Sequence, residues 1–164
     1  MTTQTVTERP TDVRSAVGPT IVVGWDGSAA SRVAMGVAAR LARYGDLIAV
    51  HAHRSSTAHV TARWQELLEG DAAERSMALL ETIPGAGIEG LELLHVEARS
   101  LDGTPVEALL RAARDSGAAA IAVGSRGVGE STAPLGSVSA ELLAVADRPV
   151  LIVPPAAVHP DHEA

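Results

Sequence analysis

The sequence of 164 residues contains no cysteine, no lysine and no phenylalanine. Without cysteine it can form no disulfide, no thiolate nucleophile and no cysteine-ligated zinc or iron–sulfur cluster. Without lysine it has no Schiff-base chemistry and no Walker-type phosphate loop, whose lysine reaches the phosphates. Aromatic residues make up only 2% of the chain. Ring-stacking platforms for single-stranded nucleic acid or sugars are therefore disfavoured.

Positive charge is also scarce, because 13 arginines stand against 20 acids and the net charge is −7. Nucleic acid and anionic membranes both attract concentrated positive charge, so we expect neither as a partner. The longest apolar runs are too short to span a membrane, and the first ten residues do not resemble a secretory signal. We therefore expect a cytoplasmic protein of one domain, with 46% hydrophobic residues to build its core.

The middle of the chain alternates between short apolar runs and amphipathic segments. Residues 1–18 and 155–164 are polar and aperiodic, which predicts flexible tails on either side of a domain over 19–154. The apolar runs predict five buried strands, at 20–24, 46–53, 91–98, 118–123 and 149–153. Apolar residues recurring every three or four positions predict helices from about 28 to 44, from 64 to 83, from 104 onward, and after the loop that ends at 137.

The predicted helices carry specific signals. Thr104, Pro105 and Glu107 form the pattern of a capping box with proline in the first turn. The apolar face of the first helix is predicted to contain Ala30, Val33, Val37, Leu41 and Tyr44. One side of the last helix is predicted to carry Val138, Leu142 and Val145.

Strands that alternate with helices predict an α/β fold, with an open parallel sheet covered by helices on both faces. In such sheets ligands bind beyond the carboxyl ends of the strands, where the strand order reverses. We therefore expect three segments to converge on one site: 24–28, 51–53 and 124–137.

The strongest local feature is the glycine-rich segment 124–137, which leaves a strand and enters a helix at Gly136 and Ser137. Glycines permit positive φ and close approach of the backbone to a ligand, and the helix N-terminus favours an anion. The segment is either a phosphate cradle made without lysine or a flexible loop with an ordinary N-cap. It matches neither the dinucleotide-binding fingerprint nor the G-x-S-x-G nucleophile elbow.

Two residues after the first strand leave alternatives open. Asp26 could accept hydrogen bonds from a ribose or an adenine, or help to hold Mg²⁺, or it could cap the first helix together with Ser28. Trp25 could pack in the core or stack on a base.

The histidines allow a weaker hypothesis. His51 and His53 share a face of the second strand, and with His95 they could bind a metal. The alternative is that they form the polar rim of a pocket.

Several of these segments together resemble the universal stress protein family. The resemblance rests on Ile21–Ser28, Gly103–Pro105, Ala120–Gly127, Leu135–Ser139 and Asp147–Pro154, and it spans nearly the whole predicted domain. It implies a five-stranded sheet of order 3-2-1-4-5, of the adenine nucleotide alpha hydrolase type, and a homodimer formed through the last strand.

One branch of that family binds ATP through G-x-x-G, nine residues, and then G-S or G-T. The resemblance implies an adenine nucleotide (ATP, or else AMP or ADP), with Mg²⁺ only as its companion and no catalytic residue. The implied binding residues are Asp26, Val50, Val123, Gly124, Arg126, Gly127, Gly136, Ser137 and Val138.

The sequence departs from this motif because eight residues, not nine, separate Gly127 from Gly136. The favoured hypothesis is a stress-response regulator or sensor that acts through nucleotide occupancy, with at most slow ATP hydrolysis. The alternative is a nucleotide-free dimeric scaffold of the same fold, which the shorter loop favours. A small hydrolase or ligase of the same type lacks catalytic residues and a substrate domain.

Overall fold

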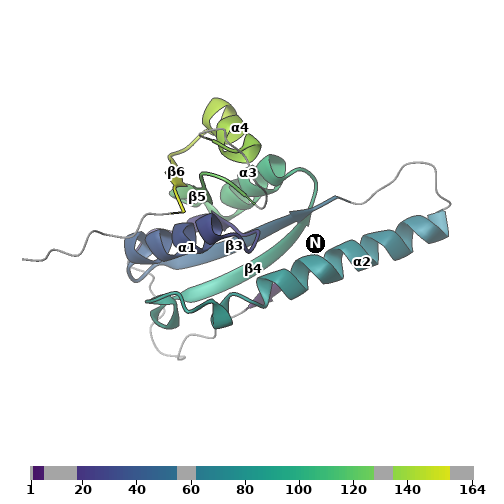
Figure 1. Cartoon of the computed structure of the whole chain (residues 1–164), viewed down its shortest axis with the longest axis horizontal. Coiled ribbons are helices and arrows are strands. Elements are labelled where there is room, and N and C mark those ends of the chain that lie inside the picture. The colour runs from purple at the N-terminus through teal and green to yellow at the C-terminus, as the bar shows by residue number, and fades with distance from the viewer. Residues whose placement is uncertain (1, 6–17, 55–61, 128–134, 156–164) are drawn as a thin grey trace, which may run out of the picture.

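The computed structural model describes residues 2–5, 18–54, 62–127 and 135–155, which form a single sheet with helices on both faces (Figure 1). The strands are β1 (Thr2–Thr5), β2 (Ile21–Gly24), β3 (Asp46–His53), β4 (His95–Asp102), β5 (Ala120–Gly124) and β6 (Val150–Val153). The helices are α1 (Ala29–Ala42), α2 (Ala62–Leu80), α3 (Pro105–Ser116) and α4 (Ser137–Val145), with short 3-10 turns η1 (Pro84–Ala86) and η2 (Leu91–Leu93).

The sheet order is β1-β4-β3-β2-β5-β6, and the five strands β2 to β6 run parallel. If the five parallel strands are numbered 1 to 5 along the chain, starting at β2, their order in the sheet is 3-2-1-4-5. The predicted fold class is therefore confirmed. The chain first builds outward from β2 to β3 and β4, and then returns to build β5 and β6 on the other side. The order therefore reverses between β2 and β5.

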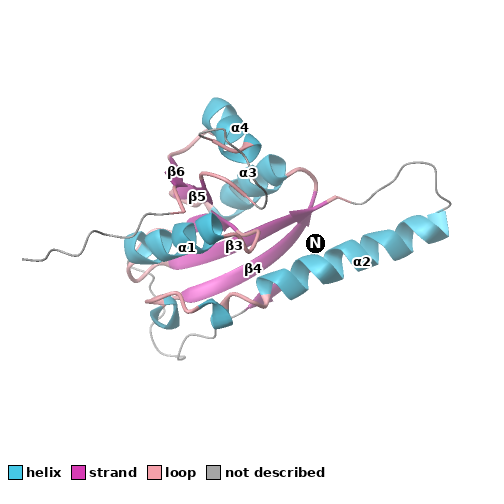
Figure 2. Cartoon of the chain, in the orientation of Figure 1, coloured by secondary structure: helices cyan, strands magenta, loops and turns pink. Residues whose placement is uncertain are grey.

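Helices lie on both faces of the sheet (Figure 2). The core consists of two layers of side chains, one on each face. On one face, Val23 and Leu47 pack with Met35 of α1 and Leu80 of α2. On the other face, Ile48 and Ile121 pack with residues of α3 and with Leu142 of α4. No helix among the described residues is long and apolar enough to cross a membrane.

The buried face of α1 differs from the predicted one. The buried positions are mostly small, such as Ala34, Ala38 and Ala42, with Met35 as the one large buried side chain of the helix, whereas Leu41 is 48% and Tyr44 is 74% exposed. A stripe of alanines lets the helix approach the sheet closely, and the larger side chains then lie at its flanks. The helical period was predicted correctly, but the wrong side of the helix was assigned to the core. The prediction favoured the large apolar side chains over the alanines.

The third predicted strand also begins later than expected. Leu91 opens the turn η2, and β4 starts only at His95. Gly90 precedes the turn with φ of 85°, and Leu91 and Leu94 are buried while Leu93 is exposed. Apolar residues three apart fit a 3-10 turn, in which positions i and i+3 lie on the same side. The predicted range 91–98 was therefore wrong at its start, and also at its end, because β4 continues to Asp102.

Residues 2–5, expected within a tail, pair as the antiparallel strand β1 with residues 97–100 of β4. This strand is an addition to the predicted sheet. The outer edge of β4 has unpaired peptide groups that can accept a partner, and the threonines of β1 are β-branched residues that favour extended backbone.

Arg148 connects the segment before β6 to the end of α3 through hydrogen bonds to the backbone. Its Nη1 donates to the carbonyls of Ala113 at 2.7 Å and Ala118 at 2.8 Å. The guanidinium also bonds the carboxylate of Asp147, and this contact is the main cause that lowers the pKa of Asp147 to about 2.

We expect Arg148→Ala to lower the free energy of unfolding by about 1–3 kcal/mol, because the carbonyls of Ala113 and Ala118 lose the hydrogen bonds from the guanidinium, although Ala113 O still accepts from Ala118 N. The matched control is Arg114→Ala, which removes an exposed ion pair to the same Asp147. Exposed pairs contribute about 0–1 kcal/mol. Urea denaturation of both variants measures the difference, and equal losses would contradict the role given to the backbone contacts.

Candidate functional site

The carboxyl ends of β2, β3 and β5 surround a cavity of about 590 Å³. It lies where the strand order reverses, at the position where open α/β sheets bind ligands. The three segments expected to converge do meet here, because each contributes lining residues: Gly24–Asp26 from the first, His51 and Ala52 from the second, and, among the described residues of the third, Gly124, Arg126, Gly127, Leu135, Gly136 and Ser137. The nine residues that the family resemblance implied are all among the lining residues: Asp26, Val50, Val123, Gly124, Arg126, Gly127, Gly136, Ser137 and Val138.

Hydrogen bonds in the turn after β2 decide whether Asp26 caps α1 or is available to a ligand. Ser28 is the N-cap of α1, because its Oγ accepts from Ser31 N at 3.1 Å. Asp26 instead accepts from Ser28 N at 3.0 Å through Oδ1, and so holds the turn. A Cβ placed on Gly127 would lie 2.7 Å from Asp26 Oδ2. The carboxylate therefore lies in the cavity wall, directly beside the glycine-rich segment.

Trp25 packs in the core and does not offer its ring to the cavity. The residue is only 2% exposed, and its Nε1 donates to Leu79 O at 3.1 Å. The alternative in which this ring stacks on a base is therefore wrong. Its contribution to the cavity is the backbone at the end of β2.

The end of β3 presents free peptide groups that the sequence analysis missed. Val50 O accepts from Trp25 N on the β2 side, and His53 O accepts from Gly103 N on the β4 side. Peptide groups alternate between the two neighbouring strands, so those of Ala52 point to the β2 side. Because β2 has already ended at Gly24, the N–H and C=O of Ala52 have no strand beside them. The alternation of peptide groups along β3, counted to the end of the strand, was the signal that could have identified Ala52.

Hydrogen bonds connect the two ends of the glycine-rich segment. Gly136 N donates to Ser125 O at 2.7 Å, and the Ser139 hydroxyl is 3.0 Å from the same carbonyl. Residues 128–134 between them, with Gly129, Glu130 and Pro134, lie outside the described residues. The hydrogen bond holds Gly136 against Ser125 at the eight-residue spacing that this chain has.

The N-terminus of α4 opens on the cavity without a side-chain cap. Its N-cap is Gly136, with φ of −73°, and no side chain bonds the first turn. By contrast, Ser28 caps α1, and Thr104 and Glu107 form the predicted capping box on α3. A Cβ on Gly136 would make only ordinary contacts of 3.4 Å or more. Neither backbone conformation nor packing within the protein therefore requires glycine at this N-cap.

Gly124 has a different reason to be glycine. A Cβ there would lie 2.6 Å from the Cβ of Ala30, so the close packing of β5 on α1 excludes any side chain. Glycine permits positive φ, but Gly124, Gly127 and Gly136 do not adopt it.

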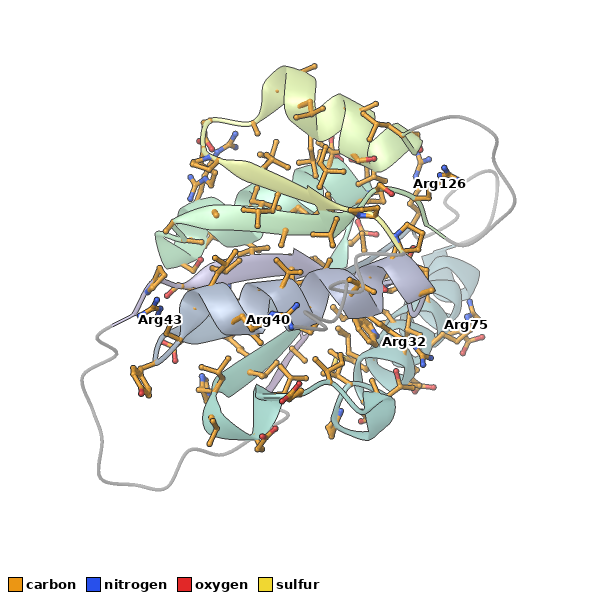
Figure 3. All side chains as sticks on the ribbon, turned by 60° about the vertical axis from the view of Figure 1, so that its left-hand side comes forward. Arg32, Arg40, Arg43, Arg75 and Arg126 are labelled. Carbon is orange, nitrogen blue, oxygen red and sulfur yellow. The ribbon has the colours of Figure 1, made fainter. Side chains whose placement is uncertain are left out.

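The cavity has an apolar and a polar region. Side chains of Val50, Leu109, Val123 and Val138 contribute apolar walls, whereas Gly127, Gly136 and Ser137 bring backbone groups and a hydroxyl. Arg126 is the only arginine among the described lining residues. In Figure 3 it lies near the end of β5, apart from the row of Arg32, Arg40 and Arg43 along α1. A ligand with an apolar ring at one end and an anion at the other fits this division.

The three histidines do not come together. His51 bonds Trp25 O at 2.7 Å and His53 bonds Ser100 Oγ at 3.1 Å, both at the carboxyl end of the sheet. His95 begins β4 at the opposite end, 3.7 Å from Asp46. No cluster of three metal-ligating side chains occurs within the described residues. Burial lowers the pKa of His53, against the opposing effect of Asp102.

Comparison with known proteins agrees with this fold. Residues 19–154 match the universal stress protein family, and the chain belongs to that family. A universal stress protein in complex with cAMP is 30% identical, with a TM-score of 0.55, and the alignment covers 85% of this chain and 98% of that one. No curated protein matches the sequence.

Two further structures share the fold at lower identity. UspA from Lactobacillus plantarum is 21% identical with a TM-score of 0.65, covering 85% of this chain and 99% of its own. The universal stress protein from Archaeoglobus fulgidus in complex with dAMP is 18% identical with a TM-score of 0.52, covering 85% and 99%.

Proposed function

We propose that this protein binds an adenine nucleotide in the cavity between β2 and β5 and acts in a stress response through nucleotide occupancy. The observation that carries the proposal is the uncapped N-terminus of α4 at Gly136, which opens on the cavity. Unsatisfied N–H groups and the helix dipole attract an anion there. The missing side chain at Gly136 leaves room for a phosphate group to approach the backbone.

The opposite part of the cavity suits the nucleoside. Val50 and Leu109 offer apolar surface for a purine ring, and Ala52 offers one donor and one acceptor from its peptide groups. Asp26 Oδ1 is engaged by Ser28 N, so Oδ2 is the oxygen that would accept from a ribose hydroxyl. Because Asp26 adjoins Gly127, its carboxylate could also bind a Mg²⁺ ion together with the phosphates. Carboxylate and phosphate oxygens are common ligands of Mg²⁺.

The nucleotide-bound relatives support this proposal. A family member at 30% identity is in complex with cAMP, and one at lower identity with dAMP. We propose ATP as the principal ligand, with AMP and ADP as candidates, and at most slow hydrolysis. The same proposal includes a homodimer formed through β6 and a cytoplasmic location.

The competing function is a nucleotide-free dimeric scaffold, which the eight-residue spacing between Gly127 and Gly136 favours. The hydrogen bond from Gly136 N to Ser125 O weakens that argument, because it holds Gly136 beside the end of β5 at this spacing. The two functions differ in one measurable property, which is the stabilisation of the folded protein by nucleotide.

We expect ATP with Mg²⁺ to raise the melting temperature of the protein. A ligand at a hundred times its Kd stabilises the native state by about 2.7 kcal/mol, or roughly 5–10 °C for a chain of this length. Differential scanning fluorimetry with ATP, ADP, AMP and cAMP measures the shift and ranks the nucleotides. The absence of a shift at millimolar concentrations of all four would support the scaffold instead.

Asp26→Ala is expected to weaken nucleotide binding by about 1–3 kcal/mol, since a charged hydrogen-bond acceptor is lost. The matched control is Ser28→Ala, which removes the N-cap of α1 and should lower stability by about 1 kcal/mol with little effect on affinity. Calorimetric titration and urea denaturation of both variants separate the two roles. Unchanged affinity in Asp26→Ala would remove this carboxylate from the proposed site.

A further inference from the structure

The solvent-facing side of α1 carries positive charge and no negative charge. The helix contains Arg32 and Arg40 but no acid, and Arg43 follows as its C-cap. All three arginines are exposed, and they form a row along the helix (Figure 3). Spacings of eight and three residues keep them on one side of the helix, opposite the alanines that pack on the sheet. We call this row the arginine face.

The guanidinium groups of the arginine face have no acidic partner. No hydrogen bond or ion pair joins them to any residue that the structure describes. By contrast, Arg99 binds Glu97, while Arg114 and Arg148 both bind Asp147. The chain has 20 acids for 13 arginines, so a shortage of acids does not explain the difference. The arginine face is therefore a positive surface on a protein with a net charge of −7.

The C-terminal end of the arginine face has two further unusual features. Arg43 has a φ of 50° and is the only residue other than glycine with positive φ in the described part of the chain. Such a conformation at a helix end is usually taken by glycine. Tyr44 follows directly, and this only tyrosine of the sequence is 74% exposed. Tyrosine and arginine are both enriched among the residues that contribute most to binding at protein interfaces.

We infer that the arginine face, together with Tyr44, is a docking surface for an acidic segment of another protein. The guanidinium groups would donate to carboxylates of the segment, and the ring of Tyr44 would pack on its apolar atoms. The helix rises by about 16 Å from Arg32 to Arg43, which corresponds to about five residues of extended chain. A segment with several aspartates or glutamates within that length therefore matches the row.

Other anionic partners fit this surface less well. A nucleic acid or an anionic membrane extends beyond the arginine face and would also meet the acidic remainder of the protein surface. A short acidic segment is affected mainly by charges within about 8 Å, the screening length at physiological ionic strength. A second copy of this chain, docked symmetrically on the same face, would place arginine against arginine.

The test uses fluorescein-labelled deca-glutamate and measures its binding by fluorescence anisotropy at low ionic strength. The wild-type protein is expected to bind this peptide, and added salt should weaken the binding. Arg40→Glu is expected to weaken it by about fivefold, because a carboxylate replaces a guanidinium. The matched control is Arg75→Glu on α2, which makes the same change of charge at another exposed arginine, outside the arginine face. That variant should bind the peptide like the wild type.

Two further variants test the end of the arginine face. Glycine adopts positive φ without strain, so Arg43→Gly is expected to raise the melting temperature of the free protein by a few degrees. The same substitution removes a guanidinium and should weaken peptide binding several-fold. A second peptide, with the same glutamates and additional leucines, should bind more tightly than deca-glutamate, and Tyr44→Ala should remove that gain.

Three outcomes would overturn the inference. The first is no binding of deca-glutamate by the wild-type protein. The second is equal weakening by Arg40→Glu and Arg75→Glu, which would show that binding follows net charge alone. The third uses inorganic polyphosphate as a competitor: if it binds more tightly than either peptide and is lost in the same variants, the face takes a phosphate chain. Nucleotide binding is a separate measurement, because Ser31 lines the cavity near the start of α1 and Arg43 lies at its other end.

Discussion

Gly136→Asp is expected to make the free protein more stable and to abolish nucleotide binding. The N-cap of α4 has extended backbone angles that any residue adopts, and a Cβ there has room. An aspartate would supply the missing cap and complement the helix dipole, for a gain of about 0.5–1 kcal/mol. The same carboxylate would occupy the N–H groups that we assign to the phosphates and repel their charge. Affinity should fall by roughly a hundredfold or more, about 3 kcal/mol.

Opposite changes in stability and affinity distinguish a phosphate site from an ordinary helix end. Gly136→Ala is the control, because it adds a Cβ without a cap or a charge and should lower stability slightly. Urea denaturation of the free proteins and calorimetric titration with ATP give both quantities for each variant. Gly136→Asp that binds ATP as tightly as the parent would show that the phosphates do not approach this helix.

The parallel sheet and the location of the site could be predicted from patterns along the chain, whereas the strand order 3-2-1-4-5 was implied by the resemblance to the universal stress protein family. Apolar runs separated by amphipathic segments predict a parallel sheet, and the glycine-rich segment after the fourth predicted strand lies where the order reverses. The capping box at Thr104 was predicted from three residues and is present with both hydrogen bonds. Such features are local, so the sequence alone contains their causes.

Features that depend on contacts between distant segments could not be predicted in the same way. The buried face of α1 is mostly alanine, and at Ala30 the helix approaches β5 so closely that a Cβ on Gly124 would lie 2.6 Å from the Ala30 Cβ. The role of Ala52 follows from the register, in which Gly24 at the end of β2 pairs with Val50 while β3 continues for three more residues, to His53. Trp25 was placed correctly after β2, but only the position of Leu79 on α2 decides that its ring is buried.

The position of β6 could also be seen only in the folded structure, where this strand forms one edge of the sheet. Ile121 N donates to Pro149 O and Ser125 N donates to Val153 O, so the odd-numbered residues of this segment pair with β5. The peptide groups of Val150 and Ile152 consequently point outward. Nearby on α4, Leu143 is 57% and Val145 is 51% exposed, although Val145 was predicted on the same side as the buried Leu142.

An unpaired apolar edge is an aggregation hazard unless something covers it, and no lysine is present to protect this one. Pairing with the β6 of a second copy would satisfy the outward peptide groups and bury the exposed side chains in a self-complementary interface. We therefore expect a dimer in solution, with or without nucleotide, and light scattering at micromolar concentration measures its mass. A stable monomer at that concentration would contradict the proposed interface.

Ile152→Pro tests the edge directly, because it removes an outward N–H and leaves the hydrogen bonds between β5 and β6 in place. The expected result is loss of the dimer, with the mass of one chain or of irregular aggregates, and with far-ultraviolet circular dichroism that remains native. The matched control is Leu151→Pro, one residue away, whose N–H lies on the β5 side. That variant should instead destabilise the fold, by about 3 kcal/mol or less. A dimer that survives in Ile152→Pro would place the interface on another surface, whatever the outcome of nucleotide binding.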